Sequence, residues 1–343
     1  MLKRGARRGA TAKRGRAFAA WADAYAGRRV LVTGASGFLG SALVAALSGA
    51  ECRITRLLRR RADIPAPRDR ARIVDIIGDI RQRSTWKRAL AGIDLVFHLA
   101  GQTSERAASA DPAADFDANV LPMLHLVRAC RRRAPPAVIF AGTATECGVT
   151  GRAPVNEDHA DNPASVYDLH KLIAEILLAE HVRSGCLHGT TLRFSNIYGP
   201  SAAPSAQAAE RGVLVAMMRR ALRGEPLPLY AGGERLRDYL YLDDAVRALV
   251  LAGLHAESLQ RQQYIVGSGI GCGLRSSFEL VADRAALRTG RRVAVTTVPT
   301  PRQNARIGSR SFVADSRRFR RATGWRPRIS LREGIDLTLD MLR

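Results

Sequence analysis

The sequence has no long hydrophobic run and few cysteines, and both shortages narrow what the chain can be. No apolar run reaches the ~18–20 residues that a membrane-spanning helix needs, so we expect no membrane partner. The five cysteines are widely spaced along 343 residues and form no C-x-x-C pair, which argues against a zinc site or a disulfide framework. This cysteine usage fits a reducing cytoplasm, and we expect no metal and a cytoplasmic location.

Lysine is scarce as well, accounting for only four of the 54 basic residues, so arginine carries most of the net charge of +23. The arginines are scattered apart from short clusters, and no aromatic side chains alternate with them as stacking platforms for bases would require. We therefore expect a solvated basic surface and no specific nucleic-acid partner. The positive charge should still attract an anionic substrate over a long range.

The N-terminal 20 residues carry seven basic groups and no acid, and they lack the continuous apolar segment of a secretory signal. We expect residues 1–27 to form a basic, disordered tail outside the fold. A transit peptide, which is also basic and poor in acids, stays an alternative.

From Arg28 onward, strand-like and helix-like segments alternate regularly. The predicted strands are short and rich in branched apolar residues: Arg29–Thr33, Arg53–Leu58, Arg72–Ile77, Asp94–Ala100, Ala137–Phe140 and Thr190–Phe194. Helical patterns lie between them. This alternation predicts an α/β fold with a Rossmann-type, doubly wound parallel sheet.

The alternation becomes irregular after residue 195, which indicates a smaller, C-terminal substrate-binding lobe. We expect a dinucleotide-binding domain over residues 28–195 with a return segment near 236–266. The lobe would then comprise residues 196–235 and 267–343. Ligands are expected in the cleft between the two.

A glycine-rich turn, Thr33–Gly40, follows the first predicted strand and precedes a predicted helix. Its glycines Gly34, Gly37 and Gly40 have the spacing G-x-x-G-x-x-G. Such a turn brings the backbone close to a pyrophosphate and places the phosphates at the positive end of the helix. The pattern predicts a nicotinamide dinucleotide site.

The identity of that dinucleotide depends on the end of the second strand, where an acid favours NAD and an arginine accommodates the 2′-phosphate of NADP. The chain has Arg59 there and no acid, which favours NADP over NAD. Asp79, after the third strand, could accept a hydrogen bond from the adenine amino group or cap the helix that follows. Both interpretations of Asp79 stay open.

Tyr167 and Lys171 are four residues apart and share one face of a predicted helix. A tyrosine with its ordinary pKa of about 10 is a poor base at neutral pH, and a nearby ammonium stabilises its phenolate and lowers that pKa. A hydroxyl partner, Thr143, follows the fifth strand, where a parallel sheet presents its active edge. The trio predicts proton transfer at a carbinol carbon.

Several ordered motifs resemble the NAD-dependent epimerase/dehydratase family of extended short-chain dehydrogenases/reductases, which act on nucleotide sugars. The resemblance covers about residues 28–343. Its motifs are the turn Thr33–Gly40, Phe97–Gly101, Asn119-Val120 as a helix start, Phe140–Gly148, Tyr167–Lys171, Arg193–Pro200, Arg237-Asp238-Tyr239 with Asp243-Asp244, and Gly324–Pro327.

The resemblance implies roles for individual residues. Thr143, Tyr167 and Lys171 would be the catalytic triad, and Thr145, Asn196 and Arg237 would bind the substrate, with the last two holding its diphosphate. Arg302 or Arg306 would add a further phosphate contact. The implied cofactor-binding residues are Gly34, Gly37, Phe38, Leu39, Gly40, Arg59, Asp79, Ile80, Leu99, Ala100, Asn119, Tyr167 and Lys171. We expect Asp243-Asp244 to cap the helix that follows.

The two residues after the catalytic hydroxyl separate reactions within that family. Dehydratases carry Asp-Glu there and the decarboxylating branch carries a Glu at the second position, whereas Ala144-Thr145 resembles the 4-epimerases. Glu146 lies one place further on and would point the other way if the strand continued. The resemblance thus implies a nucleotide-sugar 4-epimerase that uses NAD or NADP.

Two alternatives stay open. The arginine after the second strand favours an NADPH-dependent reductase of an NDP-4-keto-sugar, and some members of the fold act only as cofactor-binding scaffolds. As in relatives, we expect a homodimer.

Overall fold

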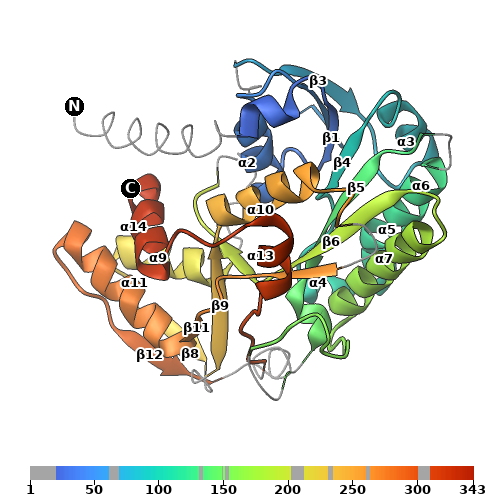
Figure 1. Cartoon of the computed structure of the whole chain (residues 1–343). Coiled ribbons are helices and arrows are strands. Elements are labelled where there is room, and N and C mark those ends of the chain that lie inside the picture. Colours follow the sequence, from blue (N-terminus) through green and yellow to red (C-terminus); the bar gives the residue numbers. More distant parts are fainter. Residues whose placement is uncertain are drawn as a thin grey trace.

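A seven-stranded parallel sheet forms the centre of the molecule (Figure 1). The computed structural model describes residues 21–61, 69–130, 134–148, 150, 154–201, 212–230, 235–259, 263–299 and 310–343. The strands follow the order β10-β6-β5-β4-β1-β2-β3, and every neighbouring pair is parallel. They are β1 (Arg29–Thr33), β2 (Arg53–Leu58), β3 (Arg72–Ile77), β4 (Leu95–His98), β5 (Ala137–Thr143), β6 (His188–Phe194) and β10 (Gln263–Val266). The predicted Rossmann-type fold is confirmed.

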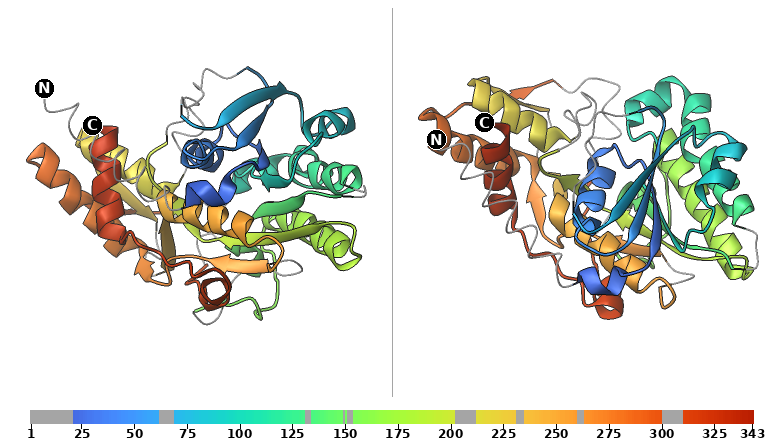
Figure 2. Two further views of the ribbon diagram at one scale, coloured as in Figure 1. Left: turned by 45° about the horizontal axis from the view of Figure 1, so that its top comes forward. Right: turned by 90° about the horizontal axis from the view of Figure 1, so that it is seen from above.

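Helices cover both faces of this sheet (Figure 2). One face carries α2 (Phe38–Leu47) and α10 (Leu242–Leu254), which pack against each other. The other face carries α3 (Arg83–Ala89), α6 (Leu121–Ala129) and α7 (Val166–Arg183). Two shorter helices, α4 (Glu105–Ala110) and α5 (Pro112–Asn119), pack beside α7.

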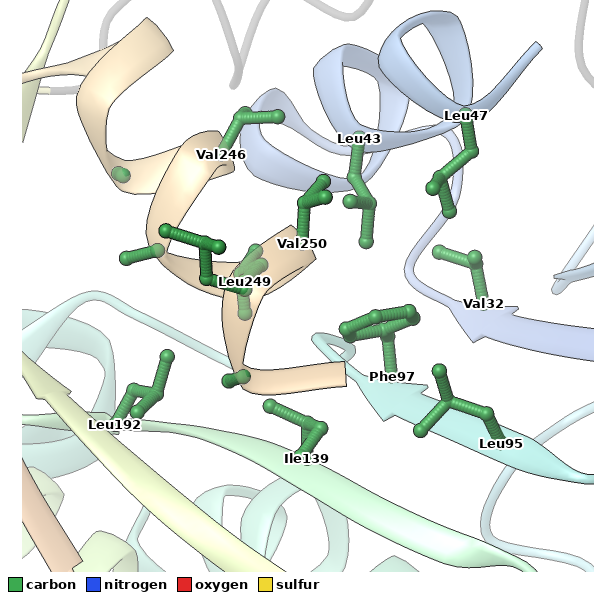
Figure 3. Close-up of a cluster of buried hydrophobic side chains, with 14 of the residues drawn as sticks. Val32, Leu43, Leu47, Leu95, Phe97, Ile139, Leu192, Val246, Leu249 and Val250 are labelled. Atoms are coloured by element: carbon green, nitrogen blue, oxygen red, sulfur yellow. The ribbon is translucent and has the colours of Figure 1, made fainter. Parts of the chain in front are cut away.

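Successive side chains along a strand point to opposite faces of the sheet, so each strand contributes to two apolar clusters. Val30 and Val32 of β1 belong to the cluster under α2 and α10, while Leu31 between them belongs to the cluster under α3, α6 and α7. Figure 3 shows the first cluster, in which Val32 and Phe97 lie beneath Leu43 of α2 and Val250 of α10. Because both faces are buried, the strands read as continuous apolar segments.

The C-terminal part of the chain packs around a third apolar cluster. It contains a three-stranded sheet in the order β11-β9-β7 and a two-stranded sheet, β12-β8. Its elements are β7 (Asn196–Tyr198), α9 (Val213–Arg223), β8 (Leu227–Tyr230), β9 (Leu236–Tyr241), β11 (Gly271–Gly273), α11 (Leu274–Thr289), β12 (Val295–Val298) and α14 (Leu331–Leu342). The helix α13 (Arg317–Thr323) instead packs against β10, and its Phe319 belongs to the first cluster. In Figure 1, α9, α11 and α14 lie together on the side away from α3, α6 and α7. The division into two domains stays a prediction.

The predicted tail is too long at its C-terminal end. Residues 1–20 lie outside the described residues, but a 3-10 helix, η1 (Asp23–Tyr25), precedes β1. The Tyr25 ring is only 1% exposed, and its hydroxyl donates to the Val250 carbonyl oxygen at 2.8 Å. Residues 21–27 therefore belong to the packed structure, because Tyr25 covers the end of α10.

The expected cap of α10 is also wrong. Tyr241 occupies the N-cap position without a side-chain cap, and Asp243 and Asp244 lie inside the first turn. The buried Asp244 carboxylate accepts from the backbone N–H groups of Arg328 and Ile329 at 2.8 and 2.9 Å. Asp244 thus holds the segment before α14 against α10. No helix among the described residues is long and apolar enough to cross a membrane.

Candidate active site

The glycine-rich turn packs so tightly that side chains would not fit. Gly34 has a φ of +66°, and a Cβ there would lie 2.8 Å from the Ala100 nitrogen at the end of β4. A Cβ at Gly40 would lie 2.2 Å from the Gly34 carbonyl oxygen, so this glycine lets α2 approach the turn. Gly37 is the N-cap of α2, and Phe38 and Leu39 are the first residues of that helix.

This turn fits the pyrophosphate of a dinucleotide. Among the residues that the structure describes, no side chain caps the N-terminus of α2, and its first turn contains no acid. The N–H groups of that turn therefore face the edge of the sheet with a positive partial charge that favours an anion. The residues present thus fit a nicotinamide dinucleotide at the carboxyl end of β1.

Thr33 joins the ends of β1 and β4 below this turn. Its Oγ1 accepts from the backbone N–H groups of Leu99 and Ala100, both at 3.1 Å, and lies 2.8 Å from His98 Nδ1. Burial, with a smaller contribution from Lys171, lowers the pKa of His98 to about 3, so the ring is neutral. Because Thr33 Oγ1 already accepts from two N–H groups, its own proton is the one left for Nδ1 of the neutral ring. His98 is a structural residue, as its apolar strand indicates.

The ends of β2 and β3 lie side by side at the same edge and carry Arg59 and Asp79. The Asp79 carboxylate accepts from the backbone and the guanidinium of Arg81, which holds the pKa of Asp79 below its usual range. Because α3 has no side-chain cap, the alternative role of Asp79 as a helix cap is wrong. Ile80 accepts from the Trp86 indole at 2.7 Å. Adenine binding by Asp79 and Ile80 stays a prediction.

Asn119 ends α5 rather than starting a helix, which corrects the expected helix start. The next helix, α6, begins at Leu121, two residues after Asn119, and Pro122 occupies its first turn. The buried Asn119 amide donates to the Gln102 carbonyl oxygen at 3.2 Å and to Asp115 at 3.1 Å. Its Oδ1 has no partner among the described residues. A buried acceptor without a partner is expected where a ligand supplies the donor.

Thr143 is the last residue of β5, and the chain then turns into a 3-10 helix, η2 (Ala144–Cys147). The Thr143 hydroxyl lies 2.9 Å from the Thr145 hydroxyl, so both predicted residues share one side of the turn. Glu146 Oε1 accepts from the Thr143 backbone N–H at 3.0 Å. The strand ends at Thr143, so its alternation does not set the direction of Glu146, and a capping box instead folds Glu146 back onto the Thr143 N–H.

Tyr167 and Lys171 lie in the first two turns of α7, which Ser165 caps through a hydrogen bond from the Asp168 N–H at 3.1 Å. The Lys171 ammonium donates to the Ala141 carbonyl oxygen of β5 at 2.6 Å and lies 3.9 Å from the centre of the Phe140 ring. These contacts fix the Tyr167–Lys171 face of α7 against the strand that ends in Thr143. The structure thus brings the predicted trio to one edge of the sheet.

The electrostatics of this trio differ from the expectation. Burial raises the pKa of Tyr167, and the charges of Glu146, Asp168, Glu105 and Asp115 raise it further. Burial lowers the pKa of Lys171 to about 8, against the attraction of Glu146 and Glu175. The predicted lowering of the Tyr167 pKa is therefore wrong for this structure, because Lys171 is directed at Ala141 and carboxylates surround the phenol.

Arg193 links the elements behind the trio. Its buried guanidinium donates to Glu175 of α7 at 2.5 and 3.0 Å and to Asp161 at 2.5 and 2.9 Å. The Nε atom also lies 3.1 Å from Glu146 Oε2. Burial and the Glu175 charge raise the pKa of Glu146 well above its usual range, despite the opposing Arg193 charge. This network holds η2, α7 and β6 in one arrangement.

Two signals in the sequence point to this network, which the motifs alone do not predict. Glu175 is four residues after Lys171 and eight after Tyr167, so it shares their helix face. Arg193 is the one charged residue of the predicted buried strand Thr190–Phe194, and a buried charge requires a partner.

The predicted substrate residues approach the same region from the C-terminal part. Asn196 begins β7, is exposed, and donates to the Asp238 carbonyl oxygen at 3.2 Å. Arg237 of β9, the strand next to β7, donates to the backbone carbonyl oxygens of Leu236 and Arg310. Burial lowers the pKa of Arg237, so the group is partly removed from water although it keeps its charge. Arg302 and Arg306 lie outside the described residues.

Comparisons with known proteins agree with this geometry. The chain is 29% identical over 323 residues to a UDP-glucose 4-epimerase of Mycolicibacterium smegmatis, which covers 92% of this chain and 98% of the relative. It is 28% identical over 312 residues to GDP-6-deoxy-D-mannose reductase of Pseudomonas aeruginosa, which covers 90% and 95%.

A solved structure of a UDP-glucose 4-epimerase of Thermus thermophilus in complex with NAD has a TM-score of 0.75 and 31% identity to this chain. The likeness covers 92% of this chain and 99% of that one. The profile of the NAD dependent epimerase/dehydratase family matches residues 30–267. The chain therefore belongs to the NAD-dependent epimerase/dehydratase family.

Proposed function

We propose that the chain is a nucleotide-sugar 4-epimerase that uses a nicotinamide dinucleotide. One observation carries the proposal: Thr143 and the Tyr167–Lys171 face of α7 meet at the carboxyl edge of the sheet that also carries the glycine turn. A hydroxyl, a phenol and an ammonium beside a dinucleotide site suit reversible oxidation of a sugar carbinol.

The chain's own residues would handle the proton. In its phenolate form, Tyr167 Oη takes the proton of the sugar 4-hydroxyl and becomes the phenol, which later returns the proton, and the Thr143 hydroxyl orients that 4-hydroxyl. Because burial lowers the Lys171 pKa to about 8, its ammonium can exchange a proton near neutral pH. When bound, the dinucleotide supplies a reversible hydride acceptor.

The sugar must present its other face before Tyr167 returns the proton, so an epimerase must hold the substrate by its diphosphate rather than by the ring. Arg237 suits this role, because its guanidinium makes charge-assisted, two-pronged hydrogen bonds to phosphate. Asn196 lies on the strand beside it, which directly follows β6 of the large sheet. Thr145, whose hydroxyl contacts that of Thr143, would contact the sugar.

The contacts of Glu146 argue against a dehydratase or decarboxylase. Eliminating water requires a carboxyl group free to reach the sugar, in addition to the tyrosine. Glu146 is fully buried, with one oxygen on the Thr143 N–H and the other beside Arg193. It therefore supports the catalytic turn from behind.

A second candidate, an NADPH-dependent reductase of an NDP-4-keto-sugar, is favoured by Arg59. This side chain is exposed immediately after β2 and close enough to Asp79 to lower the pKa of that carboxyl. An arginine at this place accommodates a 2′-phosphate. The same catalytic trio would serve this reaction.

The protein as purified can distinguish the two candidates. Bound dinucleotide is released by denaturation and identified by mass, and the native protein is offered UDP-glucose and UDP-N-acetylglucosamine without added cofactor. Bound NAD with formation of the 4-epimer is the expected result. Turnover of a 4-keto sugar nucleotide only when NADPH is supplied would replace the epimerase by the reductase. Failure of both assays would contradict both.

A further inference from the structure

Arg310 joins two elements that flank the candidate catalytic tyrosine. Its Nη1 donates to Glu105 of α4 at 2.7 Å, and its Nη2 donates to Asp168, the residue after Tyr167 on α7. The Arg310 side chain is 7% exposed and that of Asp168 is fully buried. Taking three charges out of water is costly unless they pair, so their pairing constrains α4, α7 and the segment that carries Arg310.

The backbone around Arg310 is fixed by β9 and by a bridge to Val155. The Phe312 N–H donates to the Leu236 carbonyl oxygen at 3.1 Å, and the Val155 N–H donates to the Val313 carbonyl oxygen at 2.8 Å. The Arg237 guanidinium donates to the Arg310 carbonyl oxygen. The residue proposed to bind the diphosphate therefore contacts the residue that reaches Asp168.

This cluster is incompletely satisfied. Glu105 Oε2, Asp168 Oδ1 and Arg310 Nε are buried and have no hydrogen-bond partner among the described residues. Buried polar atoms without partners are uncommon and need an explanation beyond stability. An ion pair kept only to stabilise the fold would be expected to satisfy both carboxylates.

Tyr167 lies near several carboxylates as well as the Lys171 ammonium on its own helix face. The carboxylates that act on the phenol come from four elements: Asp168 of α7, Glu105 of α4, Asp115 of α5 and Glu146 of η2. Two of these four, Asp168 and Glu105, pair with Arg310. Asp115 pairs with His170 at 2.7 Å and Glu146 with Arg193 at 3.1 Å. Arg310 is thus the cation shared by the two carboxylates of α4 and α7.

We propose that Arg310 is a positioning residue for Tyr167: it ties the first turn of α7 to α4 and β9 and offsets the two carboxylates beside the phenol. The inference rests on the proposed proton-transfer role of Tyr167. Substrate bound at Arg237 would act on the same backbone segment that carries Arg310.

Two single variants separate this role from a purely structural one. In Arg310→Gln the carboxylates of Asp168 and Glu105 lose their cation, which disfavours the phenolate. In Asp168→Asn a carboxylate is removed and Arg310 remains, which favours it. The midpoint for ionisation of Tyr167 should rise by about one pH unit in the first variant and fall by about one pH unit in the second.

The midpoint can be measured without turnover. Each full-length protein, supplied with NAD, is titrated by ultraviolet difference absorbance against its own Tyr167→Phe counterpart, so that only Tyr167 contributes. The pH dependence of kcat with UDP-glucose is a second readout. Arg284→Gln is the matched control, because it breaks a two-pronged pair with Asp336 on α11 and α14 and should leave the midpoint unchanged.

Shifts of opposite sign in the two variants, with none in the control, are the expected result. Equal shifts, shifts of the same sign or no shift would overturn the proposal, even if both variants lose stability. Retained epimerase activity in Tyr167→Phe would instead overturn the proposed function, while the titration would still report on Arg310.

Discussion

At the scale of the single residue, Lys171 shows how burial opposes the charged form of an ammonium group. Its side chain is 6% exposed, and its ammonium donates to Ala141 and faces the Phe140 ring. Burial lowers its pKa from 10.5 to about 8. The folded protein therefore releases this proton at a lower pH than the unfolded chain does. As a result, Lys171 lowers the free energy of unfolding when the pH is at or below about 8, and this penalty disappears as the pH rises to 10.5.

We predict that this pH dependence of the free energy of unfolding disappears in Lys171→Met. In the native chain, Lys171 should make the free energy of unfolding rise by about 3 kcal/mol between pH 8 and 10.5. Urea denaturation at both pH values measures the rise. Lys87→Met, at an exposed lysine of α3, is the control and should show the same rise as the native chain. The same rise in Lys171→Met would show that Lys171 is not a buried charge.

Individual residues also mark where sequence reasoning stops. Gly34, Tyr167 and Lys171 could be predicted because short-range spacing places them on a turn or on one helix face. The raised pKa of Tyr167 could not, because it results from burial in the fold and from the charges of Glu146, Glu105 and Asp115 on three other elements. Spacing along one helix contains no information on such long-range neighbours.

At the scale of the element, β9 shows how a single carboxylate can join strands and turns. Asp238 is fully buried and accepts from the Ser195 hydroxyl at 3.1 Å, the Ser268 N–H at 2.7 Å, the Gly269 N–H at 2.9 Å and the Ala314 N–H at 3.0 Å. These donors come from the segments that follow β6 and β10 and from the segment before α13. Asp238 thus links the large sheet to the strand that carries Arg237.

Asp238→Asn should therefore lower the free energy of unfolding by about 2–3 kcal/mol, because one carboxylate oxygen becomes an amide that faces N–H donors. Chemical denaturation measures the loss. Asp340→Asn, which weakens an exposed pair with Arg288, should cost less than about 1 kcal/mol. If the two variants are equally stable, Asp238 does not organise β9.

The elements of the sheet could be predicted well, and the turns between them less well. Four strands, β1, β2, β3 and β6, end at the predicted residue, because apolar runs bounded by glycine or charge define buried strands. The turn after Thr143 was not predicted, although Thr143 and Glu146 have the T-x-x-E spacing of the capping box that forms η2. The contact of Glu146 with Arg193 of β6 could not be predicted from that local spacing.

At the scale of the whole molecule, an apolar strip lies on the outer surface of α5 and α7. Phe116 of α5 is 41% exposed, and Leu169 and Ile176 of α7 are 44% and 52% exposed. The spacing of Leu169 and Ile176 places them on one helix face, and Phe116 packs edge-on against His170 beside them. We propose that a second copy of the chain covers this strip in a homodimer.

Ile176→Glu should then convert the dimer to a monomer, because it places a charge in the covered strip. Sedimentation velocity measures the change. Leu287→Glu, at a 70% exposed leucine on α11, is the control and should stay dimeric. A native chain that sediments as a monomer would contradict the homodimer.

The measurement that tests the central claim most directly compares the native chain with Tyr167→Phe. Both proteins are loaded with NAD, and formation of the 4-epimer from UDP-glucose is followed together with binding of NAD. The account predicts that NAD binding is unchanged while turnover falls by at least about 10²-fold, the contribution typical of a positioned acid–base group. Full turnover in Tyr167→Phe would contradict proton transfer by this residue and, with it, the proposed active site.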